Sequence, residues 1–156
     1  MPKVKPIPDG YHSVSPYLII DNGRASEALD FYVRAFGAKE KFRMPRPEGG
    51  IMHAEIQLGD SVIMLADENS QMGAHGPKHY GGSPITPFVY VPDVDATTKQ
   101  AEHAGARITR PVEDQYYGDR TSGVEDPFGY KWYLATHIRD VSMDELQQHV
   151  NAAATA

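Results

Sequence analysis

A strand–turn–strand pattern that occurs twice constrains this chain more than any other feature of its sequence. The second copy spans residues 118–136, where β-forming residues flank the turn Asp126-Pro-Phe-Gly129. Pro127 presets φ near about −65° at the second turn position, and Gly129 readily adopts a positive φ. The first copy spans residues 51–66, with Gly59-Asp60 between its strands. Two such hairpins in one short chain predict an internal repeat.

The segments that precede the hairpins repeat as well. Residues 86–91 resemble residues 15–20 position by position, 71 residues later, and both are apolar runs typical of strands. Helical spacing of apolar residues follows each run, over residues 24–36 and over residues 93–103. A further strand is predicted near residues 39–44 in the first half and near residues 106–109 in the second. Each half is therefore predicted to be β-α-β-β-β.

Capping residues mark the ends of these helices. Asp21 or Asn22 is the expected N-cap of the first helix, and Asp93 of the second. Gly37 and Gly105 supply the C-terminal stops.

The predicted fold class is α+β, with two βαβββ modules that share one core, because a single module would leave an apolar sheet face exposed. The modules span residues 14–67 and 86–137, and a Gly/Pro-rich linker joins them at residues 68–85. The tail, residues 138–156, begins a short helix with the capping box Ser142-Met-Asp-Glu145 and ends it near residue 150.

Composition narrows the classes of function. The chain has 156 residues and no cysteine, which excludes disulfides, thiolate zinc sites and cysteine nucleophiles. We expect a cytoplasmic protein, since the N-terminus lacks the apolar run of a signal peptide and no stretch approaches the ~20 apolar residues of a membrane span. The formal net charge is −6 without a basic stripe. This charge argues against a nucleic-acid partner and favours a neutral or cationic ligand, while the lack of a membrane span argues against a membrane partner.

Together these landmarks resemble the vicinal oxygen chelate superfamily, which includes glyoxalase I, extradiol dioxygenases, and fosfomycin and bleomycin resistance proteins. The resemblance is closest to its PhnB-like branch. The motifs that carry it are Pro16-Tyr-Leu18, residues 27–37, Met52-His-Ala-Glu55, residues 60–65, Gly118-Asp-Arg120, Asp126-Pro-Phe-Gly129, Trp132 and Ala135-Thr-His137. The resemblance implies that each module curls into half a barrel, that paired modules enclose a cavity, and that the protein is a homodimer with pockets near the subunit seam.

The resemblance also implies where a metal ion would bind. Metal-dependent members take ligands from the first and last strands of each module. Motif matching places those positions at Ser15, Met64, Thr86 and Tyr133. None is a histidine or a carboxylate, which Zn²⁺, Ni²⁺, Mn²⁺ and Fe²⁺ prefer. We therefore expect no metal and no cofactor.

Strand alternation assigns side chains to a helix side and a cavity side. Met52, Ala54, Ile56 and Leu58 are predicted on the helix side of the first module, and Trp132 and Leu134 on that of the second. The candidate ligand contacts are Tyr17, His53, Glu55, Met64, Phe88, Tyr90, Tyr116, Tyr117, Arg120 and Tyr133. These mostly aromatic side chains are typical of a small-molecule pocket.

Several of these residues have a structural alternative. His53 and Glu55 share a strand face ~7 Å apart and form a polar handle for a ligand, an acid/base pair or a relocated metal site, or else a cross-strand salt bridge or an ordinary polar position. Arg120 binds an anionic or carbonyl group, or pairs internally with Asp119, Glu125 or Asp126. Tyr116 and Tyr117 cover the pocket or pack at a dimer seam.

Two linker histidines show zinc-like spacing. His75 and His79 are four residues apart, but Gly76 and Pro77 between them argue against a helix, so we interpret the spacing as coincidence.

The leading hypothesis is a metal-independent protein that binds and sequesters a small aromatic or cationic molecule, similar to bleomycin-resistance proteins. The alternative is a metal-dependent glyoxalase-like lyase, isomerase or dioxygenase that uses His53 and Glu55. A third hypothesis is a structural dimer with a vestigial pocket.

Overall fold

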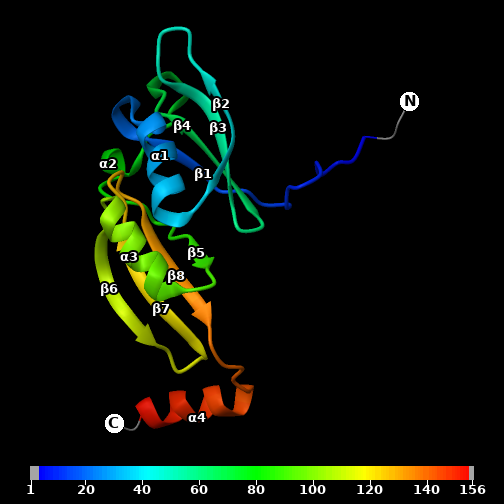
Figure 1. Ribbon diagram of the computed structural model, residues 1–156, viewed down its shortest axis with the longest axis vertical. Coiled ribbons are helices and arrows are strands. Elements are labelled where there is room, and N and C mark those ends of the chain that lie inside the picture. Colours follow the sequence, from blue (N-terminus) through cyan, green and yellow to red (C-terminus); the bar gives the residue numbers. More distant parts are fainter. Residues whose placement is uncertain (1–3, 155–156) are drawn as a thin grey trace.

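The computed structural model describes residues 4–154 and contains two modules, each a four-stranded sheet with one long helix on one face (Figure 1). The elements of the first module are β1 (Tyr17–Ile20), α1 (Ala25–Phe36), β2 (Lys39–Pro45), β3 (Ile51–Leu58) and β4 (Ser61–Asp67). Those of the second are β5 (Phe88–Tyr90), α3 (Val94–Ala104), β6 (Arg107–Asp114), β7 (Asp119–Glu125) and β8 (Lys131–His137). The α+β repeat predicted from the two hairpins is confirmed.

The two sheets have the same topology. Their strand orders are β1-β4-β3-β2 and β5-β8-β7-β6. The first strand of each module runs parallel to the last, and the other neighbours are antiparallel. The predicted Asp126–Gly129 turn is present: Gly129 has φ of 94°, and its N–H donates to the Asp126 carbonyl at 3.2 Å.

The modules share one core because α1 packs against α3 and its aromatic side chains contact Trp132 of the second sheet. The ring of Tyr32 on α1 lies 5.3 Å from that of Trp132 on β8, and the ring of Phe36 lies 5.0 Å from it. Trp132 and Leu134 are fully buried, as predicted, together with Ala54 and Ile56 of the first sheet. Met52, predicted on the same face as Ala54, is instead 48% exposed.

The N-terminus of α1 is capped by an acidic residue other than the predicted Asp21 or Asn22. Asp67, at the end of β4, accepts the Ala25 N–H at the start of α1 at 2.8 Å. Asp21 instead accepts the N–H groups of Gly76 and Lys78 at 3.0 and 3.1 Å, which caps a later helix. Neither Asp21 nor Asn22 is therefore the N-cap of α1. Asp93 does cap α3, through the Ala96 N–H.

The linker and the tail contain more helix than the sequence predicted. A single 3-10 turn, Ser70–Met72, precedes α2 (Pro77–Tyr80). Pro77 begins α2 instead of preventing it, because proline lacks only an N–H that has no helical partner in the first turn. The predicted capping box is confirmed, since Ser142 and Glu145 exchange hydrogen bonds, but α4 (Met143–Ala154) runs past residue 150.

Strand β6 is longer than predicted. It continues through Pro111 to Asp114, so the predicted strand end at residue 109 is wrong. Proline is tolerated there because β6 is an edge strand and its register shifts between Arg110 and Glu113.

Candidate functional site

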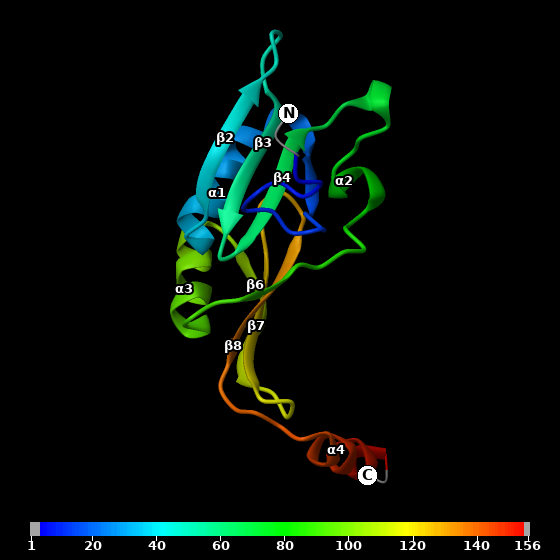
Figure 2. The same cartoon turned by 90° about the vertical axis from the view of Figure 1, so that its right-hand side faces the viewer.

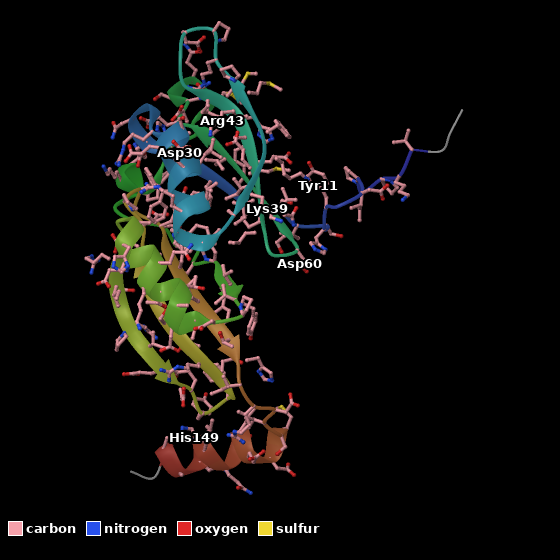
Figure 3. All side chains as sticks on the ribbon, in the orientation of Figure 1. Tyr11, Asp30, Lys39, Arg43, Asp60 and His149 are labelled. Carbon is pink, nitrogen blue, oxygen red and sulfur yellow. The ribbon has the colours of Figure 1, made fainter. Side chains whose placement is uncertain are left out.

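The face of the first sheet that is turned away from α1 carries a cluster of hydrogen-bonded polar side chains beside a cavity. The N-terminal arm, residues 4–14, crosses in front of this open face, with α1 behind the sheet (Figure 2). Figure 3 shows Tyr11 on the arm, on the side of the sheet away from α1. Arm and sheet together line a cavity of about 590 Å³, whose sheet residues include Glu55 and Met64. This volume is ordinary for a small-molecule site.

Hydrogen bonds join Tyr17, His53, Glu55 and Tyr11 into what we call the polar network. The Tyr17 hydroxyl lies 2.7 Å from His53 Nδ1, and His53 Nε2 lies 3.2 Å from Glu55 Oε1. Tyr11 donates its hydroxyl to Glu55 Oε2. Because a carboxylate only accepts, His53 donates its Nε2–H to Glu55. Glu55 is therefore the terminal acceptor of the network.

Glu55 is a buried anion at the base of this cavity. The side chain is almost fully buried, and burial alone would raise its pKa, but hydrogen bonds from Tyr11 and His53 lower the pKa of Glu55 below its ordinary value. The Lys41 Nζ lies 4.0 Å from the carboxylate and 3.9 Å from the centre of the Tyr11 ring. The open face thus already holds one ammonium between a carboxylate and an aromatic ring.

The open face of the second sheet, which is turned away from α3, holds a different pocket. Its volume is about 390 Å³, and Phe88, Tyr117 and Tyr133 are among its walls. The Arg110 guanidinium lies 5.2 Å from the centre of the Tyr133 ring. Within residues 4–154, Arg110 has no ion-pair partner. This pocket therefore offers aromatic walls, the Arg110 guanidinium and the Glu113 carboxylate.

The predicted contacts fall into two groups on the two sheets. Tyr17, His53, Glu55 and Met64 lie together on the first open face. Phe88 lies 5.3 Å from Tyr90 and 6.2 Å from Tyr133 between ring centres, and Tyr117 lines the same pocket.

Two predicted contacts lie elsewhere. Arg120 is on the α3 side of the second sheet, where Asp95 binds it bidentately at 2.7 and 2.9 Å and Asp114 at 2.7 Å. The alternative of an internal ion pair is thus the arrangement seen, although its partners are not the predicted Asp119, Glu125 or Asp126. Tyr116 stacks on His149 of α4, with ring centres 4.1 Å apart, so it packs against the tail helix.

Sequence reasoning missed three residues of the open faces. Tyr11 and Lys41 complete the surroundings of Glu55, and Arg110 extends over Tyr133. Arg110 was missed because β6 was predicted to end before it. A longer strand would have placed Arg110 opposite Gly123, on the face of Tyr133. Nothing in the sequence of the arm indicates that it folds back onto β3.

The family-type metal positions do not provide suitable ligands. Ser15 and Met64 line the arm cavity, and Tyr133 lines the pocket of the second sheet. Hydroxyl, thioether and phenol groups are poor ligands for the divalent metals concerned. Among residues 4–154, no three or more histidines and carboxylates form a group suited to a metal ion. His53 and Glu55 alone supply two ligands, which is fewer than such a site needs.

A second chain of titratable groups lies at the far end of β7 and β8. Asp119 is nearly buried and binds the Tyr90 hydroxyl at 2.8 Å and His137 Nδ1 at 2.7 Å. His137 Nε2 lies 3.0 Å from Asp140, in the segment that leads to α4. The hydrogen bonds to Asp119 and then Asp140 raise the pKa of His137 above 6.5.

We expect the folded-state pKa of His137 to exceed about 6.5, the value of an unperturbed histidine. A raised folded pKa means that His137 stabilises the fold fully below about pH 6.5 and that this contribution is lost as the pH rises through the folded value. NMR titration of the His137 imidazole protons measures it directly. Asp119→Asn should lower the pKa more than Asp140→Asn. A pKa at or below 6.5 in the unmodified chain would contradict this assignment.

None of the helices in the described part of the chain, residues 4–154, has the length and apolar content needed to span a membrane.

The sequence of the chain is similar to a known protein family and to individual proteins. The family described as Glyoxalase/Bleomycin resistance protein/Dioxygenase superfamily matches residues 16–134. An uncharacterized protein of Mycobacterium bovis is 42% identical over 138 residues, which cover 86% of this chain and 90% of that protein.

Solved structures share the fold. TioX from Micromonospora sp. ML1 is 27% identical with a TM-score of 0.62, over 81% of this chain and 100% of that one. A gene product from Arabidopsis thaliana is 26% identical with a TM-score of 0.63, over 80% and 98%. A PhnB protein from Bacillus cereus, 18% identical with a TM-score of 0.60 over 80% and 99%, has the same fold.

Proposed function

The chain belongs to the Glyoxalase/Bleomycin resistance protein/Dioxygenase superfamily, and we propose that it is a metal-independent member that binds a small aromatic cation. The observation that carries this proposal is Glu55, an ionised and buried carboxylate at the base of a cavity of about 590 Å³. A buried anion attracts a cation strongly because little water screens it. The same superfamily fold hosts many activities, so the ligand class rests on this site and not on the fold.

Lys41 supports a cationic ligand. Its ammonium lies between the Tyr11 ring and the Glu55 carboxylate, at 3.9 and 4.0 Å. The position thus satisfies a cation both by charge and by cation–π attraction. Lys41 is on a long flexible side chain at the sheet surface, so a rigid aromatic cation can replace its ammonium and stack on Tyr11 as well. A ligand of this type competes with Lys41 for Glu55.

Pairing of two copies is the second part of the proposal. The molecule has a solvent-accessible surface of 9778 Å², whereas a compact monomer of 17.3 kDa would expose roughly 7,800 Å². Part of the excess is aromatic, since Tyr17, Phe88 and Tyr90 on the two sheets are all exposed. A homodimer would cover these side chains and supply further walls for the ligand.

Proflavine, a planar cationic dye, is a suitable probe. We expect it to bind the unmodified chain, and Glu55→Gln to weaken binding by about tenfold or more, as the loss of a largely buried charge pair should cost over 1.4 kcal/mol. Lys41→Gln should tighten binding because it removes the competing ammonium. Fluorescence titration measures all three, and light scattering on the same samples counts the chains per complex.

The controls separate charge from shape. Glu48→Gln makes the same change in the exposed turn between β2 and β3 and should leave affinity unchanged. Acridine, neutral at pH 8, should bind more weakly than proflavine, and a chelator should have no effect. Near-stoichiometric Ni, Zn, Mn or Fe, lost in His53→Ala, would refute the proposal and favour the metal-dependent lyase or dioxygenase alternative.

A further inference from the structure

A separate pocket lies at the seam between the two modules, beside the free edge of β1. Its volume is about 390 Å³, within the range of small-molecule sites. We call it the seam pocket. Its walls come from β1, from the linker around α2 and from the turn before β8, and include Pro16, Tyr17, Pro77, Tyr80, Ile85 and Tyr130. It adjoins the polar network only through Tyr17, whose hydroxyl binds His53.

The edge of β1 offers backbone hydrogen-bonding groups to this pocket. Met64 and Glu68 donate their N–H groups to the carbonyls of Pro16 and Ile20, so alternate residues of β1 face β4. The residues between them, Tyr17 and Ile19, turn their N–H and C=O groups toward the opposite edge, along which no strand within residues 4–154 pairs.

At one position of this edge, the Tyr130 side chain binds the free backbone groups of Ile19. Its hydroxyl accepts the Ile19 N–H at 3.0 Å and donates to the Ile19 carbonyl at 2.9 Å. Burial raises the pKa of Tyr130 to about 12, so the hydroxyl keeps its proton. The N–H and C=O of Tyr17 point by the same alternation into the seam pocket. Outside the β1–β4 ladder, they have no hydrogen-bond partner among residues 4–154.

The remaining wall is mostly apolar. Proline, tyrosine and isoleucine dominate it, no Asp, Glu, Lys or Arg is among the described residues that line it, and His75, which lies 3.9 Å from Glu68, is its one basic side chain. An ion would lose most of its hydration there without a permanent counter-charge, so the wall favours a neutral occupant. Tyr80 and Ile85 are 64% and 71% exposed at the rim, and exposed apolar side chains around a concave site indicate a binding surface.

We propose that the seam pocket binds a neutral planar aromatic molecule whose amide or lactam edge pairs with the backbone N–H and C=O of Tyr17. The amide carbonyl accepts the Tyr17 N–H, and the amide N–H donates to the Tyr17 carbonyl, as a neighbouring strand would. The aromatic ring lies against the prolines and tyrosines of the walls. This site differs from the Glu55 site in both place and ligand charge.

Benzamide is the probe, titrated into the full chain and followed by backbone amide NMR. We expect chemical shift changes at Tyr17, Ile19 and Ile85, with a Kd on the order of 1 mM, as nine non-hydrogen atoms allow. Benzoate has the same shape but carries a charge, and N,N-dimethylbenzamide lacks the N–H donors. Each should bind at least about tenfold more weakly, which is the effect of one lost hydrogen bond or one unpaired charge.

Matched variants locate the site. Ile85→Glu places a charge on the rim without touching the core and should weaken benzamide binding at least about tenfold. Ile138→Glu changes an exposed isoleucine that does not line the pocket and should have no effect. Tyr11→Phe removes the hydrogen bond to Glu55 and should not alter benzamide binding, so failure of the Glu55 proposal and failure of this one are distinguishable.

Three results would overturn the seam-pocket proposal. The first is benzoate binding as tightly as benzamide. The second is shift changes centred on His53 and Glu55 in place of Tyr17 and Ile85. The third is concentration-dependent changes at Tyr80 and Ile85, the exposed rim residues, without benzamide, which would show that a second copy of the chain occupies the pocket.

Discussion

Asp126→Ala is expected to reduce the free energy of unfolding by at least about 4 kcal/mol, a large part of the ~5–15 kcal/mol typical of a domain. The Asp126 carboxylate accepts four hydrogen bonds inside the core. The N–H groups of Phe128 and Tyr130 reach Oδ1, and the Tyr32 hydroxyl and Trp132 Nε1 reach Oδ2, all between 2.8 and 2.9 Å. Alanine leaves all four donors buried without an acceptor, and urea unfolding measures the loss.

The cost should spread across both modules because Asp126 joins them. Tyr32 is on α1 of the first module, and the other donors belong to the second. Burial raises the pKa of Asp126, although the four hydrogen bonds oppose that effect. Loss of this carboxylate therefore weakens the contact that holds the two open faces in their relative positions.

A milder variant keeps the prediction testable if Asp126→Ala does not fold. Asp126→Asn retains an acceptor at Oδ1 but turns an NH₂ group toward Trp132 Nε1–H, which cannot accept. It should cost about half as much as alanine. In the Asn background, Trp132→Phe should cost about 1 kcal/mol less than in the unmodified chain, because it removes the opposing donor. Additive costs would contradict this account of the site.

Repetition made the fold predictable from the sequence. The structure contains both predicted hairpins and both predicted long helices, which are local patterns in the sequence. The spacing of 71 residues between similar segments indicated that these patterns form two copies of one module. The family resemblance is confirmed by the match over residues 16–134. Strand alternation likewise placed Tyr17, His53 and Glu55 on one face, because a period of two leaves no other choice once the helix side is fixed.

Contacts between segments far apart in the chain were not predictable in this way. Tyr11 reaches Glu55 across 44 residues, and Arg120 reaches Asp95 across 25. Nothing in either local sequence selects those partners over others of the same charge or polarity. The motif around Arg120 suggested a ligand contact. The alternation of side chains along β7 instead turns Arg120 toward α3, where the Asp95 carboxylate binds it.

The helix caps illustrate the same limit. An acidic residue just before a helical pattern is the usual N-cap, which pointed to Asp21 for α1. The chain instead makes a 3-10 turn at Asp21–Gly23, and Asp21 faces the linker. The cap of α1 comes from Asp67, 42 residues away at the end of β4. The parallel pairing of β1 and β4 brings Asp67 next to the start of α1.

Asp67→Ala is therefore expected to cost about 2–4 kcal/mol of unfolding free energy. Its carboxylate is almost fully buried and accepts the N–H groups of Ala25 and Ile51 at 2.8 and 2.6 Å. Alanine leaves both donors unpaired and removes a negative charge from the N-terminus of α1. Because Ile51 begins β3, the strand that carries His53 and Glu55, the change should also loosen the polar network.

Amide hydrogen exchange separates this effect from a general loss of stability. In Asp67→Ala, the Ala25 and Ile51 amides should exchange faster relative to other core amides. Asp67→Asn keeps one acceptor, so its loss of unfolding free energy should be about half that of Asp67→Ala. Asp60→Ala, at the exposed turn between β3 and β4, should stay within about 0.5 kcal/mol of the unmodified chain. Unchanged exchange at Ala25 and Ile51 would mean that Asp67 does not cap α1 in solution. The position of β3, the strand that carries Glu55, would then depend on its pairing with β2 and β4 alone.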